Sequence, residues 1–208
     1  MKLKKKVKVV LVILIIAIIL GVAAFFYFQK KETKKNVKEV KVINEVDKYG
    51  YKLKENKPST YKTMFTELKE ILNKETVDEE EYVKKISEMF IYDFYSLNDK
   101  TAKTDIGGVD FVYKDALENF LQKAQNTYYK YVESNIYNNR KQSLPVVTNI
   151  VVDSVEIKPY AYGDMTDEKA YSVKVNWSYT DDQFSSYQKE AILVFIHDDI
   201  KLSLVELQ

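Results

Sequence analysis

Twenty consecutive residues near the start of the chain carry no charge and constrain what the rest can fold into. The stretch 9–28, VVLVILIIAIILGVAAFFYF, holds fifteen Leu, Ile, Val or Phe side chains. As a helix it would be about 30 Å long, which matches the hydrocarbon core of a bilayer. The eight residues before it offer nothing that could bury such a helix in a soluble core. The stretch therefore predicts one transmembrane helix, with the lipid bilayer as a partner.

A cleaved signal peptide is the alternative for the same stretch. Five lysines in residues 1–8 and the small residues GVAA at 21–24 fit a signal peptide. The apolar run, however, continues through the aromatic end FFYF at 25–28 and exceeds the usual length of a signal-peptide core. Aromatic residues are enriched at membrane–water interfaces. We therefore expect an uncleaved signal-anchor that crosses the membrane once.

Lysines flank the apolar stretch on both sides, so their count alone does not decide its orientation. Five precede the stretch and six follow it between residues 30 and 41. Length decides, because a short tail with five lysines resists translocation, whereas long domains cross a membrane regardless of their charge. We expect residues 1–8 to form a basic cytoplasmic tail and the C-terminal domain to lie outside the cell membrane.

Charge and cysteine content restrict the partners of that domain. Residues 1–35 carry a net charge of +8, which leaves −7 for residues 36–208 because the whole chain is +1. The basic start suits anionic lipid headgroups, and the acidic remainder argues against nucleic acid as a partner. The chain has no cysteine, so neither disulfides nor a lipid-modified cysteine can hold it. The domain must be stabilised by its hydrophobic core.

Residues 29–57 form a lysine-rich connector with two open interpretations. Apolar residues at positions 37, 40, 43 and 46 recur every three residues and could continue the membrane helix outward. The segments 40–42 and 49–53 could equally form a short hairpin. Gly50 and Pro58 interrupt any regular structure here. We expect the folded domain to begin at residue 58 and to extend to residue 208.

Hydrophobic periodicity predicts an α+β fold for residues 58–208. A period of 3.6 indicates three helices, which begin at Ser59 or Thr60, at a capping box in 76–79, and near residue 113, the last ending about 134. The second helix is apolar nearly all round from its middle, so it is either central to the core or faces a partner. After Pro145 the period changes to 2, which predicts strands at 147–157, 170–179, 191–196 and 200–207. We expect three helices packed on a C-terminal curved antiparallel sheet of about four strands, with a bulge near Asp153.

The order of an anchor, three helices and a C-terminal sheet resembles a known family. It is similar to the nuclear-transport-factor-2-like ectodomain of the inner-membrane assembly component of type IV secretion systems and of conjugation proteins of Gram-positive bacteria. The segments IGGVDFVY at 106–113 and YGY at 49–51 also resemble uncharacterised anchored proteins of AT-rich bacteria. The resemblance covers about residues 58–208 and includes no functional motif. It implies a role in an envelope assembly and no particular chemistry.

Residues with catalytic potential are few and scattered. The single histidine, His197, stands beside two aspartates where we expect a solvated turn between the last two strands. Acidic residues at 164, 167, 181 and 182 are also expected in solvated loops. One histidine and no cysteine make a zinc site remote. We expect no catalytic residue, no metal ligand and no cofactor, and therefore no enzyme.

Two adjacent glycines, Gly107 and Gly108, lie between two aspartates in the loop before the third helix. A phosphate-binding loop would need a preceding strand and a Lys-Ser or Lys-Thr pair, which are absent. Calcium would need further oxygen ligands at regular spacing around Asp105 and Asp110. We expect a plain turn, in which the glycines permit positive φ and a close backbone approach.

A group of aromatic side chains could either fill the hydrophobic core or line a ligand pocket. Residues on one face of the strand 170–179 would oppose aromatic residues of the second and third helices. The space between them could be simple core or a ligand pocket. The candidate pocket residues are Phe90, Phe94, Phe120, Tyr128, Tyr171, Trp177 and Tyr179.

Two hypotheses for function follow. The first is a membrane-anchored domain outside the cytoplasm that binds other envelope proteins or itself and has no catalytic activity. The second is a binder of small molecules or peptides, or a weak enzyme, that uses the aromatic pocket. A cavity with converging polar groups would favour the second, and a dry core with an exposed apolar patch would favour the first.

Overall fold

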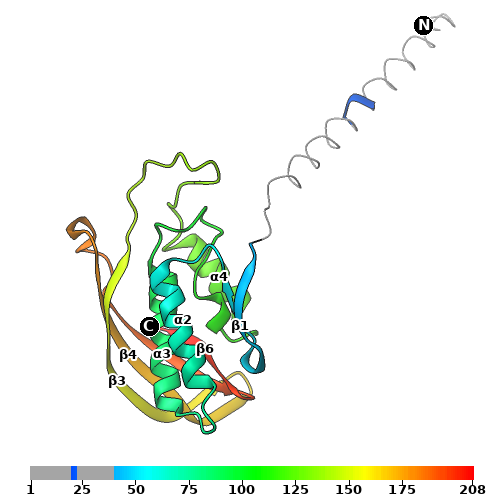
Figure 1. Ribbon diagram of the computed structural model, residues 1–208, viewed down its shortest axis with the longest axis vertical. Helices are drawn as coiled ribbons and strands as arrows, with labels where there is room; N and C mark the ends of the chain where they lie inside the picture. Colours follow the sequence, from blue (N-terminus) through cyan, green and yellow to red (C-terminus); the bar gives the residue numbers. More distant parts are fainter. Residues whose placement is uncertain (1–19, 23–39) are drawn as a thin grey trace, which may run out of the picture. The chain divides into compact units, whose positions relative to one another are not determined.

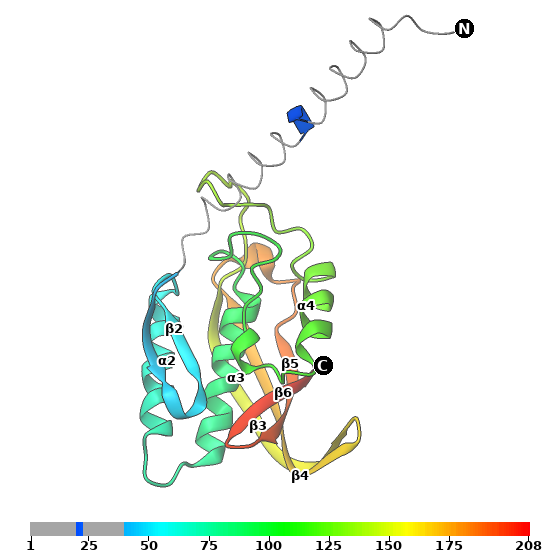
Figure 2. The ribbon, with the colours of Figure 1, turned by 90° about the vertical axis from the view of Figure 1, so that its right-hand side faces the viewer.

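The computed structural model describes residues 20–22 and 40–208, and Figures 1 and 2 draw it from two sides. The predicted membrane span 9–28 lies outside the described residues, except for residues 20–22, which are helical. The tail 1–8 and residues 29–39 of the connector also lie outside them. Within the described ranges, no helix has both the length and the apolar character that a membrane crossing requires. Residues Val42–Gln208 form one compact unit.

Four antiparallel strands form the C-terminal sheet, which confirms the predicted α+β class and the number of strands. In the order β3-β4-β5-β6 they are Val147–Tyr162, Met165–Tyr179, Glu190–Asp198 and Lys201–Leu207. Three register shifts separate segments of the β3–β4 pair, and one of them falls between Val152 and Ser154, where a bulge is predicted. Because bulges bend a strand, β3 and β4 can curve around the helices, as Figure 1 shows.

Helix α3 is the central element of the core. Its bounds are Glu79–Tyr95, and it begins where the Asp78 carboxylate accepts hydrogen bonds from the backbone N–H groups of Glu80 and Glu81. Seven successive residues, from Met89 to Tyr95, are buried. The apolar second half of this helix therefore faces the core on every side, which confirms one of the two predicted alternatives.

The other two helices of the compact unit are α2, Ser59–Leu72, and α4, Leu117–Asn126. Helix α2 packs beside α3 (Figure 1). Helix α4 is shorter than the predicted helix 113–134, because turns precede it at Ala116 and follow it at Thr127. Tyr131, which is predicted on the buried face of that helix, is 74% exposed. The predicted bounds of the third helix, 113–134, were therefore wrong, because the helix covers only Leu117–Asn126.

The described part of the connector is a hairpin, with β1 at Val42–Val46 and β2 at Tyr51–Lys54. Gly50 lies in the turn with φ of 70°, a conformation that glycine adopts without strain. Four apolar side chains of the hairpin are buried in the main core: Val46, Tyr49, Tyr51 and Leu53. The Tyr51 and Tyr82 hydroxyls are hydrogen-bonded at 2.7 Å, which ties the hairpin to α3. The compact unit therefore begins at Val42 and not at residue 58.

We expect a fragment of residues 42–208 to unfold cooperatively and a fragment of residues 58–208 to lose most of its stability. Each of the four buried hairpin side chains contributes about 1.5–3 kcal/mol by its burial. Their sum is comparable to the whole unfolding free energy of a domain, about 5–15 kcal/mol. Urea unfolding followed by circular dichroism compares the two fragments. Equal unfolding midpoints would show that the hairpin contributes nothing.

Candidate functional site

A groove of about 670 Å³ lies between helix α4 and strand β6. We call it the α4–β6 groove. It is lined by the end of α3, by one face of α4, by Val112, Tyr128, Tyr162 and Gln188, and by residues 204–208. Figure 2 shows α4 beside the β5–β6 side of the sheet, where the C-terminus lies. The groove is one place where the structure could hold a ligand, and a second pocket of about 620 Å³ lies between α2, α3 and the start of β3.

Three of the seven predicted pocket residues line the groove: Phe94, Phe120 and Tyr128. Their rings form one aromatic surface, with Phe94 5.3 Å from Phe120 and 5.8 Å from Tyr128 between centroids. Both distances lie within the range of favourable aromatic pairs. Aromatic side chains from α3, α4 and the following turn therefore converge on one cavity.

The other four predicted residues lie elsewhere. Phe90 is fully buried behind Phe94, onto which it stacks. Trp177 is 4% exposed and packs against Tyr95 at 4.4 Å. Tyr179 supports the groove from behind, where its hydroxyl is 3.3 Å from that of Tyr128. Tyr171 is hydrogen-bonded to Glu79 in a separate cluster described below. The sequence identified the aromatic layer but not which part of it faces a cavity.

Helix α4 supplies the groove with an apolar row and a polar row. Residues four apart lie above one another on a helix, which aligns Ala116, Phe120 and Ala124. The neighbouring row holds Asn119, Lys123 and Thr127 at the same spacing. Lys123 forms no ion pair within residues 40–208. The polar row was not among the predicted site residues, although its four-residue spacing beside the apolar stripe could have revealed it.

The opposite wall of the groove carries an acidic group that is already bonded. The Glu206 carboxylate accepts a hydrogen bond from the Tyr160 hydroxyl at 2.6 Å. That bond lowers the pKa of Glu206, and burial together with the same bond raises the pKa of Tyr160 to about 12. Burial and the contact with Tyr179 raise the pKa of Tyr128, which therefore stays protonated and donates to the Tyr95 carbonyl at 3.1 Å. No histidine, cysteine or serine lines the groove, so it offers no imidazole base beside the hydroxyls of Thr127 and Tyr128 or the amine of Lys123.

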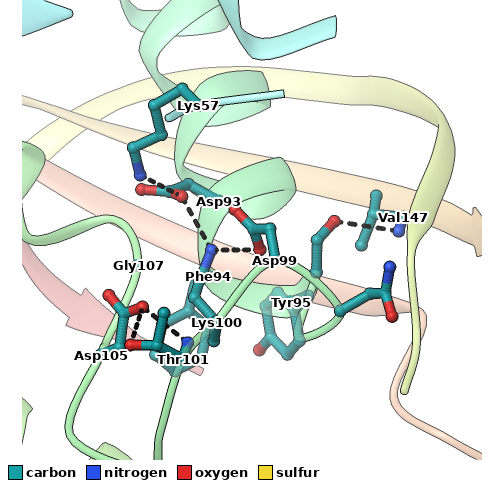
Figure 3. A network of polar contacts seen from close by, with 12 residues as sticks. Lys57, Asp93, Phe94, Tyr95, Asp99, Lys100, Thr101, Asp105, Gly107 and Val147 are labelled. Carbon is teal, nitrogen blue, oxygen red and sulfur yellow. Dashed lines mark hydrogen bonds and ion pairs between the residues drawn. The ribbon is translucent and has the colours of Figure 1, made fainter. Parts of the chain in front are cut away.

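A buried ion-pair network holds the loop that leads into α4, and Figure 3 shows it. The Asp93 carboxylate lies 2.5 Å from Lys57 Nζ and 3.1 Å from Lys100 Nζ. Its second oxygen accepts the backbone N–H of Gly108 at 2.8 Å. Burial alone would raise the pKa of Asp93, but Lys100 and Lys57 lower it to about 2. Burial alone would lower the pKa of Lys100, but the carboxylates of Asp93 and Asp99 raise it above its ordinary value.

The two glycines of the loop fit closely against this network. A Cβ on Gly107 would lie 1.9 Å from the Asp93 carbonyl oxygen. Gly108 has φ of +76°, and a Cβ there would lie 2.6 Å from the Phe90 ring. Only glycine fits at both positions, because it has no side chain that would clash with Asp93 or Phe90 and it tolerates the positive φ of Gly108. The expected turn is present, and its close backbone approach brings the Gly108 amide to a buried carboxylate.

We expect Asp93→Ala to reduce the free energy of unfolding by about 3–5 kcal/mol, because it removes the carboxylate that Lys57 and the buried Lys100 share and leaves Lys100 with Asp99 alone. Glu80→Ala on the same helix is the control, since it removes only the exposed pair with Lys84. That change should reduce it by less than about 1 kcal/mol. Urea unfolding at pH 7 measures both. Similar small losses would mean that the network contributes little.

Histidine 197 is not in a solvated turn, so this prediction was wrong. The residue lies within β5, because the turn is confined to Asp199 and Ile200. Its Nδ1 is 2.8 Å from an Asp167 oxygen, which also accepts the His197 backbone N–H at 2.7 Å. Its Nε2 is 3.4 Å from Glu79, to which the Tyr171 hydroxyl donates at 2.9 Å. Asp167, predicted in a loop, lies within β4.

This histidine cluster joins the start of α3 to two strands. Burial alone would lower the pKa of His197, but its bonds to Asp167 and Glu79 raise it above the ordinary 6.5. Burial and the bond to Glu79 raise the pKa of Tyr171, so that hydroxyl stays protonated. An imidazole paired with a carboxylate could serve as a base, but its two hydrogen-bond partners, Asp167 and Glu79, supply no hydroxyl that it could activate. We interpret the cluster as a structural one, which stabilises the packing of the start of α3 against β4 and β5.

We expect His197→Ala to destabilise the domain by about 1 kcal/mol at pH 5.5 and by less at pH 8.5. A raised folded-state pKa means that the protonated histidine stabilises the fold fully below about pH 6.5, the ordinary value. That contribution is lost as the pH rises through the raised pKa. His197→Gln is the control, since it can still form hydrogen bonds but does not titrate. Urea unfolding at both pH values tests this, and a loss that is the same at both would rule out the charged pairing.

No family model, no curated protein and no solved structure matches this chain. The resemblance to nuclear-transport-factor-2-like ectodomains therefore stays a prediction. Within residues 20–22 and 40–208, no three His, Cys, Asp or Glu side chains lie close enough together to hold a metal ion.

Proposed function

We propose that this chain is a membrane-tethered binding domain without catalytic activity, and that the α4–β6 groove is its binding site. The groove itself is the observation that carries the proposal. Its volume of about 670 Å³ falls in the usual range for ligand sites, about 300–1,000 Å³. An aromatic surface with a few polar groups at its margin is also typical of such sites.

The lining of the groove favours a ligand with an apolar or aromatic body and an anionic group. Phe120 and Tyr128, which are partly buried, offer ring surface for the body of the ligand, and Phe94, which is 4% exposed, lies behind them. Lys123 offers a charge, and Asn119 one turn away offers an amide, for a carboxylate. Glu206, on the opposite wall, is already bonded to Tyr160, and its charge disfavours a second anion there. A single anionic group next to α4 is the arrangement that this charge distribution supports.

Assembly through an exposed apolar surface is the second candidate function. Val151 and Ile157 on the edge strand β3 are 55% and 60% exposed. A flat apolar edge would favour pairing with another chain. The three register shifts along β3, however, interrupt its regular pairing geometry, and bulges are a common protection of edge strands. The groove is therefore the better supported site.

The membrane tether belongs to the same proposal and rests on the sequence of residues 1–28. The short lysine-rich tail favours a cytoplasmic start, with residues 36–208 outside the membrane. We expect protease added to intact cells or protoplasts to digest the domain and to spare a tag at residue 1. Digestion of the tag with protection of the domain would reverse the proposed orientation.

We expect 4-phenylbutyrate to bind with a dissociation constant on the order of 1 mM, given about 0.3 kcal/mol per ligand atom. Its ring would contact Phe120 and Tyr128, and its carboxylate would pair with Lys123. The amine analogue 4-phenylbutylamine should bind at least about 10-fold more weakly. Ligand-observed NMR with the full chain in lipid nanodiscs measures both.

Two variants, one just before α4 and one within it, separate binding in the groove from binding elsewhere. Ala116→Trp places a large side chain in the groove and should abolish the 4-phenylbutyrate signal. Gln122→Trp adds the same side chain at an exposed position that does not line the groove, and should leave the signal unchanged. Equal binding by both variants would contradict the proposed site.

A further inference from the structure

We infer that the α4–β6 groove binds an extended peptide, which adds a strand to the free edge of β6. The peptide is the class of ligand that we assign to the binding function proposed above, and its binding therefore rests on that function. Backbone hydrogen bonds to β6 would supply part of the affinity, and the aromatic surface would select one side chain. This mode of recognition, between a sheet edge and a helix, is used by other peptide-binding domains.

The groove runs along the backbone edge of β6. Side chains of a strand alternate between two faces, so a cavity on one face of a sheet contacts every second residue. Four successive residues, Leu204 to Leu207, line this groove. Consecutive residues can line one cavity when the strand presents its edge to it. Residues from both faces of β6 therefore border the groove, as expected for a strand that presents its edge to it.

The hydrogen-bond pattern leaves Leu207 with its backbone groups directed away from β5. Gln208 exchanges both backbone hydrogen bonds with Ile192, at 2.9 and 3.1 Å. Bonded and non-bonded pairs alternate along an antiparallel ladder, and Leu207 lies opposite Leu193 in the next, non-bonded pair. The Leu207 N–H and C=O therefore point to the outer edge, where no backbone group of the described ranges bonds to them.

The chain itself already pairs with this edge at one position. Val112 forms a parallel bridge with Leu204, and the Tyr113 N–H donates to the Leu204 carbonyl at 2.8 Å. After Tyr113 the chain turns away, since the Ala116 N–H bonds back to the Tyr113 carbonyl and α4 begins. The edge accepts a strand at Leu204 and lacks one at Leu207. A bound peptide would lie beside β6 beyond the point where the chain turns away after residues 112–113.

Helix α4 defines which kind of strand can enter. A peptide beside β6 would place alternate side chains against Phe120 and Tyr128, and an acidic group could reach Lys123. Because α4 forms the opposite wall, the edge of another sheet would meet the helix, whereas a single strand could lie between α4 and β6. These features select an extended peptide with one aromatic residue and an acidic residue near it.

A pair of modified peptides tests the pairing directly. The probe is a capped, fluorescein-labelled hexapeptide that alternates valine and threonine around one phenylalanine and ends in glutamate. Two isomers carry backbone N-methyl groups at its odd or at its even positions. Strand addition uses the N–H groups of one set only. By fluorescence anisotropy with the full chain in nanodiscs, we expect one isomer to bind within about 3-fold of the parent and the other at least about 10-fold more weakly.

A pair of protein variants tests the edge. Leu207→Pro removes the outward N–H and leaves the paired residues Glu206 and Gln208 unchanged. Leu207→Ala removes the same side chain and keeps the N–H, so it is the matched control. We expect the proline variant to bind the peptide at least about 10-fold more weakly than the alanine variant. If the proline variant does not fold, the two N-methyl isomers still decide the question.

The outcomes distinguish the peptide from the general binding function. Equal binding by the two N-methyl isomers would overturn strand addition. If 4-phenylbutyrate still competes with the peptide in that case, the groove binds apolar ligands and only the peptide inference fails. If neither the peptide nor 4-phenylbutyrate binds, both the inference and the proposed function fail.

Discussion

The buried carboxylate of Asp93 is the interaction on which the arrangement of the domain depends. It draws Lys57, just before α2, and Lys100, in the loop after α3, to one point of the core. Through the Gly108 amide it also holds the turn that directs the chain towards β6. Unpaired charges in an interior are so unfavourable that these three segments must meet. The loop between α3 and α4 is therefore positioned although it has little regular structure.

The groove is a consequence of that loop and of two tyrosines. Where the loop ends, Tyr113 pairs with Leu204, and α4 starts a few residues later. At the other end of α4, the hydroxyls of Tyr128 and Tyr129 donate to the carbonyls of Tyr95 and Phe94. Those carbonyls belong to the last turn of α3 and need partners from outside the helix. Both ends of α4 are thus fixed, and the helix stands off β6 instead of packing onto its edge.

Local patterns in the sequence predicted the elements and the α+β class well. The alternation along β4 and the apolar stripes of α2 and α3 depend only on residues close in the chain, so periodicity could reveal them. The hairpin at the start of the domain was left open, because its four buried side chains are interspersed with lysines. Asp93 and His197 were not recognised as structural, because their partners lie up to 118 residues away. No local sequence pattern predicts that β6 is an edge strand, because the order of strands is a property of the whole sheet.

The proposed strand addition depends on one backbone group, the Leu207 amide, which should be free in the unliganded protein. Residue-resolved amide hydrogen exchange of the full chain in nanodiscs measures it, with the Glu206 amide as the internal reference. We predict rapid exchange at Leu207 beside a protected Glu206, and at least 10-fold slower exchange at Leu207 when the hexapeptide is bound. Protection of Leu207 as strong as that of Glu206 in the unliganded protein would contradict a free edge and a groove open to a strand.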